Sequence, residues 1–289
     1  MYQRFLFLLL FLSLTMSLSA QGPWAQPQGK GFYKLSEWWT RFDEHFTSQG
    51  KTDPNLTTGV YNTTIYAEYG VSDRLTAIVN FPFFSRNTMN NLISEVNGET
   101  LVPGEAINGF GDAEIAAKYT FTPQGAKVPI AISLTLGLPL GEDAGGTQGN
   151  LQLGDGEFNQ LIQGHIGSSF RLGNSNAYWA VLLGINNRTQ GFSDEFRWGL
   201  EGGINFAAEK LWLIGRVRAV HSFFNGETAA GNTSTSIFAN NIEFISPGLE
   251  LNYYLTPKLG VSAGVAGAIT GRLVAASPGY TFGVFLDVK

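Results

Sequence analysis

The stretch Ile130–Leu140, IAISLTLGLPL, alternates between large apolar residues and small or polar ones. The residues at even positions are all isoleucine or leucine, and those between them are Ala131, Ser133, Thr135, Gly137 and Pro139. A period of two residues predicts a β-strand with two chemically different faces. In a soluble sandwich the apolar face would pack into the core, whereas in a membrane barrel it would face lipid.

The same alternation recurs in segments whose second face is charged, namely Gly109–Phe121, Phe158–Leu172, Glu195–Ala207 and Leu211–Phe223. The second face carries both signs of charge in comparable numbers. In a closed barrel this face would line the lumen, which is polar in such proteins. The candidate lumen-lining residues are therefore Glu114, Lys118, His165, Arg171, Arg197, Glu201, Arg216 and Arg218.

The N-terminus has the order of a secretory signal peptide. Arg4 precedes the apolar run Phe5–Leu12, and small residues lead up to Ala20. We expect residues 1–20 to be the signal peptide, with cleavage between Ala20 and Gln21. After it, no run reaches the roughly 20 apolar residues that a membrane helix needs. Since a closed barrel is the other structure that satisfies every backbone group in lipid, the sequence predicts an all-β, membrane-spanning, antiparallel up-and-down barrel.

The composition supports this prediction. Charged residues make up 14% of the chain, against about 25% in a soluble domain. Aromatic residues at 13% and 36 glycines suit the interfacial girdles and the strand bends of a barrel. The net charge of -5 and the lack of a Lys/Arg run argue against nucleic acid as a partner. A soluble exported β-sandwich is the remaining alternative for the fold.

The connections between the alternating segments have a rhythm. Short ones are predicted at Val71–Arg74, Thr122–Lys127, Gly173–Asn176, Ala208–Lys210 and Thr256–Lys258. Long ones lie between them, at Thr47–Asn55, Ser85–Asn108, Gly141–Gly156, Asn187–Asp194 and Gly226–Thr235. This order matches short periplasmic turns and longer external loops. It predicts about twelve strands, with both termini on the periplasmic side.

Residues 32–289 are predicted to form this single barrel domain, after a flexible N-terminal arm or small plug at residues 21–31, QGPWAQPQGKG. Ser85–Asn108, the longest loop, is the better candidate for a plug. Within one strand, Pro247–Gly248 predicts a bulge, because proline cannot donate to the hydrogen-bond ladder.

Four segments resemble one known family in the same order along the chain. They are AEYGVSDRLTAIVNFPFF (Ala67–Phe84), GFGDAEIAAKYTF (Gly109–Phe121), LTLGLPLG (Leu134–Gly141) and LGDGEF (Leu153–Phe158). The family is that of the outer-membrane barrels of the meta-pathway of phenol degradation. The resemblance implies a barrel that passes small, often hydrophobic, molecules. It brings no set of substrate-contacting residues, and Leu140 departs from the small polar residue usual in the family.

Motifs of catalysis and cofactor binding are absent from the sequence. No metal-ligand spacing, P-loop or dinucleotide fingerprint occurs. His165 has Gly167 where a same-face serine would be needed, and the neighbours His221 and Ser222 point to opposite faces of a strand. Asp155 and Glu157 offer too few oxygen ligands for calcium. We therefore expect no enzyme activity, no metal and no cofactor.

The sequence thus predicts a monomeric β-barrel in the outer membrane of a Gram-negative-type bacterium. We expect it to be a passive channel for small molecules, with hydrophobic or aromatic solutes as candidates, inserted by the barrel-assembly machinery. The alternative is a plugged, non-transporting barrel that serves as a structural protein or anchors a membrane assembly. For the lumen charges, cross-strand ion pairing in the wall is favoured over selection of a solute.

Overall fold

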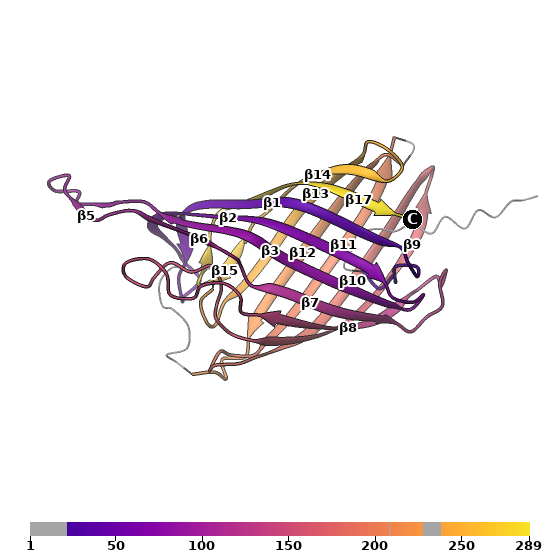
Figure 1. Ribbon diagram of the computed structural model, residues 1–289, viewed down its shortest axis with the longest axis horizontal. Coiled ribbons are helices and arrows are strands. Elements are labelled where there is room, and N and C mark those ends of the chain that lie inside the picture. Colours follow the sequence, from indigo (N-terminus) through magenta and orange to yellow (C-terminus); the bar gives the residue numbers. More distant parts are fainter. Residues whose placement is uncertain (1–21, 208, 228–237) are drawn as a thin grey trace, which may run out of the picture.

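The computed structural model describes residues 22–207, 209–227 and 238–289, and the predicted signal peptide lies outside this part of the chain. Within the described residues no helix is present, so none could cross a membrane. The strands form one closed antiparallel barrel, shown from the side in Figure 1. The all-β barrel predicted from the alternation is therefore confirmed, and the soluble sandwich is excluded.

Each wall strand pairs with its neighbours in the chain. The strands of the wall are β1 (Gly31–Phe46), β2 (Thr52–Gly70), β3 (Leu75–Met89), β7 (Ala113–Thr120), β8 (Ile130–Leu138), β9 (Asn159–Leu172), β10 (Ser175–Arg188), β11 (Glu195–Phe206), β12 (Leu211–Ser222), β13 (Glu243–Tyr254), β14 (Leu259–Ala266) and β17 (Gly279–Val288). Three short strands continue this wall at one end of the barrel, β6 (Glu105–Gly109), β15 (Thr270–Arg272) and β16 (Val274–Ala275). The barrel thus has twelve wall strands, as predicted.

The first and last strands close the barrel. Their pairing runs without a break from Gly31 opposite Val288 to Thr40 opposite Gly279. Because the number of strands is even, β1 begins and β17 finishes at the same side of the barrel, the one that carries the short turns. Closure pairs the two terminal strands of the sheet along these positions, as a sheet in lipid requires.

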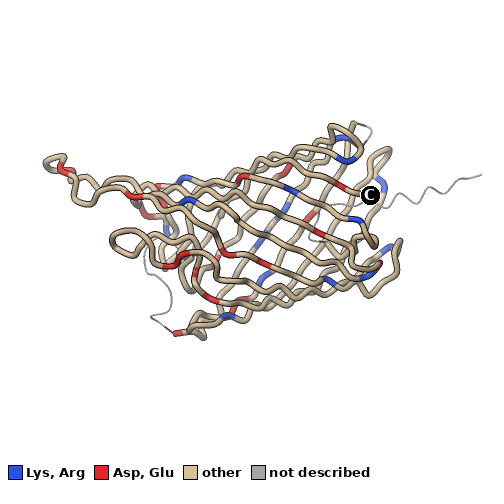
Figure 2. Tube along the Cα trace, in the orientation of Figure 1, with Lys and Arg blue, Asp and Glu red and all other residues tan. Residues whose placement is uncertain are grey.

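The two faces of the wall have opposite chemistry. Large apolar side chains are exposed on the outside, among them Leu35, Ile65, Leu134 and Leu183, each more than 40% accessible. Polar side chains are buried on the inside, and Lys118 is among the most completely buried. Figure 2 shows both signs of charge along the strands as well as at the barrel ends. Apolar side chains outside and polar side chains inside are the reverse of the arrangement in a soluble protein, and they are typical of an outer-membrane barrel.

The prediction that the loop Ser85–Asn108 forms a plug is wrong. Strand β3 runs on to Met89 and β6 begins at Glu105, so much of this segment extends the wall. Between them, β4 (Leu92–Ile93) and β5 (Thr100–Val102) form a hairpin that projects away from the barrel (Figure 1). Val96 at its tip is 96% exposed. Cross-strand pairing of β3 with β6 carries the loop outward and prevents it from folding into the lumen.

Candidate lumen and wall cavity

The segment before β1 lies inside the barrel at the end with the short turns. Lys118 Nζ donates to the Gly22 carbonyl at 3.0 Å, and Thr120 Oγ1 donates to the Pro23 carbonyl at 2.8 Å. Trp24 packs edge-on against Tyr178, with ring centroids 5.5 Å apart. Contacts from β7 and β10 therefore hold the segment across the lumen and narrow this end of it.

A network of charges occupies the middle of the lumen. Arg216 on β12 lies directly opposite Glu201 on β11, and its Nε donates to Glu201 at 2.5 Å. Its Nη1 donates to Glu250 on β13 at 2.7 Å, and Lys34 Nζ contacts Glu250 at 3.3 Å. Arg218 Nη2 lies 3.6 Å from Glu201. The structure thus joins three of the predicted residues, Glu201, Arg216 and Arg218, in one network.

Sequence reasoning missed two members of this network, Lys34 and Glu250. Both follow the alternation of their strands, β1 and β13, so the alternation is the signal that places them on the inner face. Their meeting also depends on closure of the barrel, because Lys34 lies 216 positions from Glu250 in the chain. Strands β17 and β14 separate their two strands in the wall.

A second network of charges lies at the end of the lumen that carries the long loops, opposite the N-terminal segment. Arg188, at the end of β10, bonds Asp155 at 2.8 Å, Glu157 at 2.7 Å and Glu195 at 3.0 Å. Arg197, a predicted residue, contacts Glu195 at 2.6 Å. Since Asp155 and Glu157 belong to the loop between β8 and β9, these contacts tie that loop to the mouth of the barrel. Arg188 could not be singled out from the sequence, because two of its three partners, Asp155 and Glu157, come from a long loop.

The same loop is held a second time by Asp112. Its Oδ1 accepts the Gly141 N–H at 2.9 Å and its Oδ2 accepts the Asp155 N–H at 2.8 Å. Burial raises the pKa of Asp155 to about 6, with Arg188 opposing and the nearby Asp112 adding to the rise. Burial likewise raises the pKa of Asp112. The mouth therefore holds two acids that share a poorly solvated space.

The other predicted residues lie apart from these networks. Glu114, Lys118 and His165 line a small cavity of about 160 Å³ between β7 and β9. There His165 Nε2 lies 2.8 Å from Ser133 Oγ on β8, a cross-strand neighbour that inspection of the His165 strand alone could not find. Arg171 lies exposed at the short-turn end, 3.4 Å from Asn176. In the described part of the chain, no group of three His, Cys, Asp or Glu residues could hold a metal ion.

The wall is interrupted beside the middle network. Strand β13 keeps its register with β12 through Pro247, so the bulge predicted in this strand is not there. On its other side, residues 246–247 face the three residues 267–269 of the neighbouring chain, between the pairs Gly248–Ala266 and Ile245–Thr270. The Pro247 carbonyl accepts the Gly267 N–H at 3.2 Å, but proline returns no N–H toward that neighbour. The extra residue is therefore in the partner strand.

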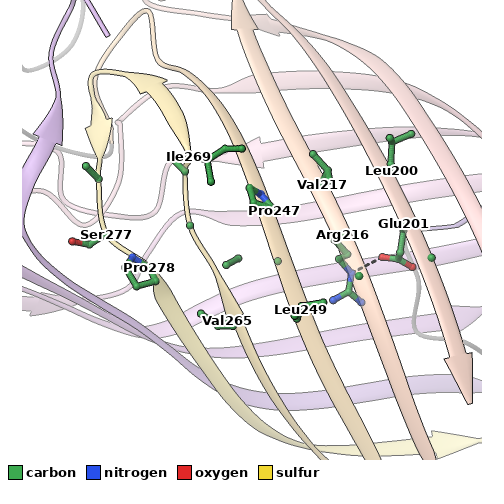
Figure 3. A pocket seen from close by; sticks show the side chains of 17 residues that line it. Leu200, Glu201, Arg216, Val217, Pro247, Leu249, Val265, Ile269, Ser277 and Pro278 are labelled. Atoms are coloured by element: carbon green, nitrogen blue, oxygen red, sulfur yellow. Dashed lines mark hydrogen bonds and ion pairs between the residues drawn. The ribbon is translucent and has the colours of Figure 1, made fainter. Parts of the chain in front are cut away.

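Where β14 ends at Ala266, its pairing with β17 also ends. The gap contributes to a cavity of about 820 Å³ between β11, β12, β13 and the chain around residues 266–269 and 276–278. Residues of both faces of the wall line it, and Figure 3 shows apolar Leu200, Val217 and Leu249 together with the Arg216–Glu201 pair. The cavity thus brings an apolar surface close to the central charges.

Comparison with known proteins shows the fold. No family model and no curated protein matches this chain. The crystal structure of an outer membrane channel from Pseudomonas putida F1 is similar, with a TM-score of 0.65 and 14% identity over 93% of this chain and 99% of that one. The KdgM porin in complex with disordered oligogalacturonate gives 0.48 and 8% identity, covering 90% and 99%. The CymD monoaromatic hydrocarbon channel gives 0.43 and 10%, covering 91% and 89%. The chain has the fold of an outer-membrane channel barrel, and its likeness to the phenol meta-pathway family stays a resemblance.

Proposed function

We propose that this protein lets small apolar or amphipathic molecules cross the outer membrane by passive diffusion, and that the wall cavity is part of their route. The observation that carries the proposal is the cavity of about 820 Å³, lined by residues from both faces of the wall. Lipid-exposed apolar side chains surround it, and Leu249 is 57% exposed. A hydrophobic solute could therefore reach it from the membrane without meeting bulk water.

The axial route is less suited to large polar solutes. The N-terminal segment crosses one end of the lumen, and the loop bound by Arg188 lies at the other. Ion pairs occupy the space between them. The similar Pseudomonas putida protein is a channel, which agrees with passage of solutes. A plugged structural barrel would share the axial features but has no need of the apolar wall cavity.

Filling the cavity tests the proposal. Gly215 lines the cavity, and a Cβ added there first meets Leu249 at 3.8 Å, so the backbone leaves room for the start of a side chain in Gly215→Leu. Gly164 on β9 is a matched control, since a Cβ there meets its first atom at 4.0 Å and the residue does not line the cavity. The probe is N-phenyl-1-naphthylamine, an uncharged dye that fluoresces when it enters apolar surroundings.

Intact cells that make the native protein should take up this dye faster than cells without it. Gly215→Leu should slow the added uptake about tenfold, whereas Gly164→Leu should change it less than about twofold. Heat-dependent gel migration verifies that each barrel is folded in the membrane. Uptake no faster than in cells without the protein would refute the proposal and favour the plugged barrel.

A further inference from the structure

We propose that Arg218, together with Arg216, forms an anion subsite beside the wall cavity, and that the preferred solutes are amphipathic anions. Such a solute has an apolar body for the cavity and a carboxylate or sulfonate for the guanidinium groups. The inference rests on the proposed function and narrows it to one class of solute. It is carried by the bonding of Arg218, by the charge balance around it and by its place in the wall.

Arg218 is underused as a hydrogen-bond donor. Its only charged contact among the described residues is Glu201, at 3.6 Å from Nη2, and its enclosed Nη1 has no hydrogen-bond partner. Arg216 on the same face, by contrast, donates to two carboxylates at 2.5 and 2.7 Å. An arginine offers five N–H groups, and leaving such donors unpaired away from water costs free energy. A bound anion would provide the missing acceptors.

The charges around Arg218 leave a positive excess. Three cations, Lys34, Arg216 and Arg218, share two carboxylates, Glu201 and Glu250. Glu201 is already the acceptor for Arg216 Nε and for the Tyr178 hydroxyl. One positive charge is thus uncompensated within this network. In surroundings of lower polarity than water, such a charge attracts an anion strongly.

The wall places this charge beside the cavity. Arg216 lines the cavity, and Arg218 is two residues further along the same face of β12, while Val217 between them lies on the outer face. The guanidinium of Arg218 lies over Gly199, where an added Cβ would be 2.5 Å from Nη1. Glycine at this position therefore makes room for the guanidinium, and the apolar and cationic parts of the site lie side by side.

Two dyes with one skeleton test the inference. N-phenyl-1-naphthylamine is uncharged, and 1-anilinonaphthalene-8-sulfonate is the same molecule with a sulfonate. The native protein should speed entry of both dyes into intact cells. Arg218→Gln should slow entry of the sulfonate about tenfold, in keeping with one lost charge-assisted bond, and change entry of the uncharged dye less than about twofold. Arg218→Lys should keep roughly half of the sulfonate entry, because it keeps the charge but not the fork of donors.

Arg171→Gln is the matched control. Arg171 shares the alternating face of β9 that carries Gln163 and His165, but it lies at the short-turn end of the barrel. Gly199→Ala is a second variant, whose added Cβ would lie 2.5 Å from Arg218 Nη1 and 2.7 Å from Leu182 Cδ1. It displaces the guanidinium while keeping its charge, and it should also slow the sulfonate selectively. Equal slowing of both dyes in Arg218→Gln and Gly199→Ala would overturn the subsite and leave the proposed function standing. So would an equal effect of Arg171→Gln, or native protein that passes only the uncharged dye. If the native protein passes neither dye, the proposed function itself fails.

Discussion

At the scale of single residues, the mouth of the barrel depends on how Asp155 is ionised. Its pKa of about 6 in the folded protein lies above the ordinary value of 3.8, because burial and Asp112 outweigh the ion pair with Arg188. The folded protein therefore binds this proton more tightly than the unfolded chain does. The resulting stabilisation is full below about pH 3.8 and is lost as the pH rises through about 6.

The variant Asp155→Asn, whose amide side chain cannot titrate, tests this pH dependence of stability. Between pH 5 and pH 8 the native protein should lose roughly 1–3 kcal/mol of unfolding free energy that the variant does not lose. Urea unfolding in detergent, followed by tryptophan fluorescence, measures the difference. Asp53→Asn, at an exposed aspartate, should keep the native pH dependence. An identical pH dependence in Asp155→Asn would show that Asp155 does not titrate in this range.

At the scale of elements, the segment before β1 fills space that the wall strands leave empty. Besides its contacts with β7, Gln26 donates its backbone N–H to Thr76 Oγ1 at 2.9 Å and its side-chain amide to Glu68 at 3.1 Å. These partners come from β3 and β2, so the segment joins inner faces of several strands. None of these contacts of the segment is part of the strand pairing that closes the barrel. The wall should therefore form without the segment.

Deleting residues 22–28 should therefore widen the lumen without preventing folding. We expect single-channel conductance in a planar bilayer to rise at least about twofold, since the narrowest section of a pore sets its resistance. Trp24→Ala removes only the ring that packs on Tyr178 and should give a smaller rise. Unchanged conductance in the deletion variant would mean that another constriction, such as the loop bound by Arg188, limits the current.

At the scale of the whole molecule, the barrel has two unlike ends. One carries the short turns, with Glu209 exposed in the turn between β11 and β12. The other carries the long loops and the projecting hairpin, in which Glu95 and Glu99 are exposed. Short turns face the periplasm and long loops face outward in outer-membrane barrels. The hairpin should therefore lie outside the cell.

A protease that cuts after glutamate can verify this orientation. Added to intact cells, it should cut at Glu95 or Glu99 and leave the bond after Glu209 whole. Permeabilised cells should also show cleavage after Glu209, which is exposed, and heat-unfolded protein is the positive control. Mass spectrometry of the fragments identifies the sites. Cleavage after Glu209, but not within the hairpin, in intact cells would reverse the orientation.

The sequence by itself determined the strand content, the two faces of each strand and the even strand count. These properties depend on alternation and turn chemistry, which are local. Glu201, Arg216 and Arg218 could be identified from parity alone, because the alternation assigns each residue to a face. Only the tertiary structure decided that Lys34 reaches Glu250 and that residues 22–26 lie across the lumen. It also decided that the wall opens opposite Pro247, since closure and register set which distant residues meet, and no local pattern records them.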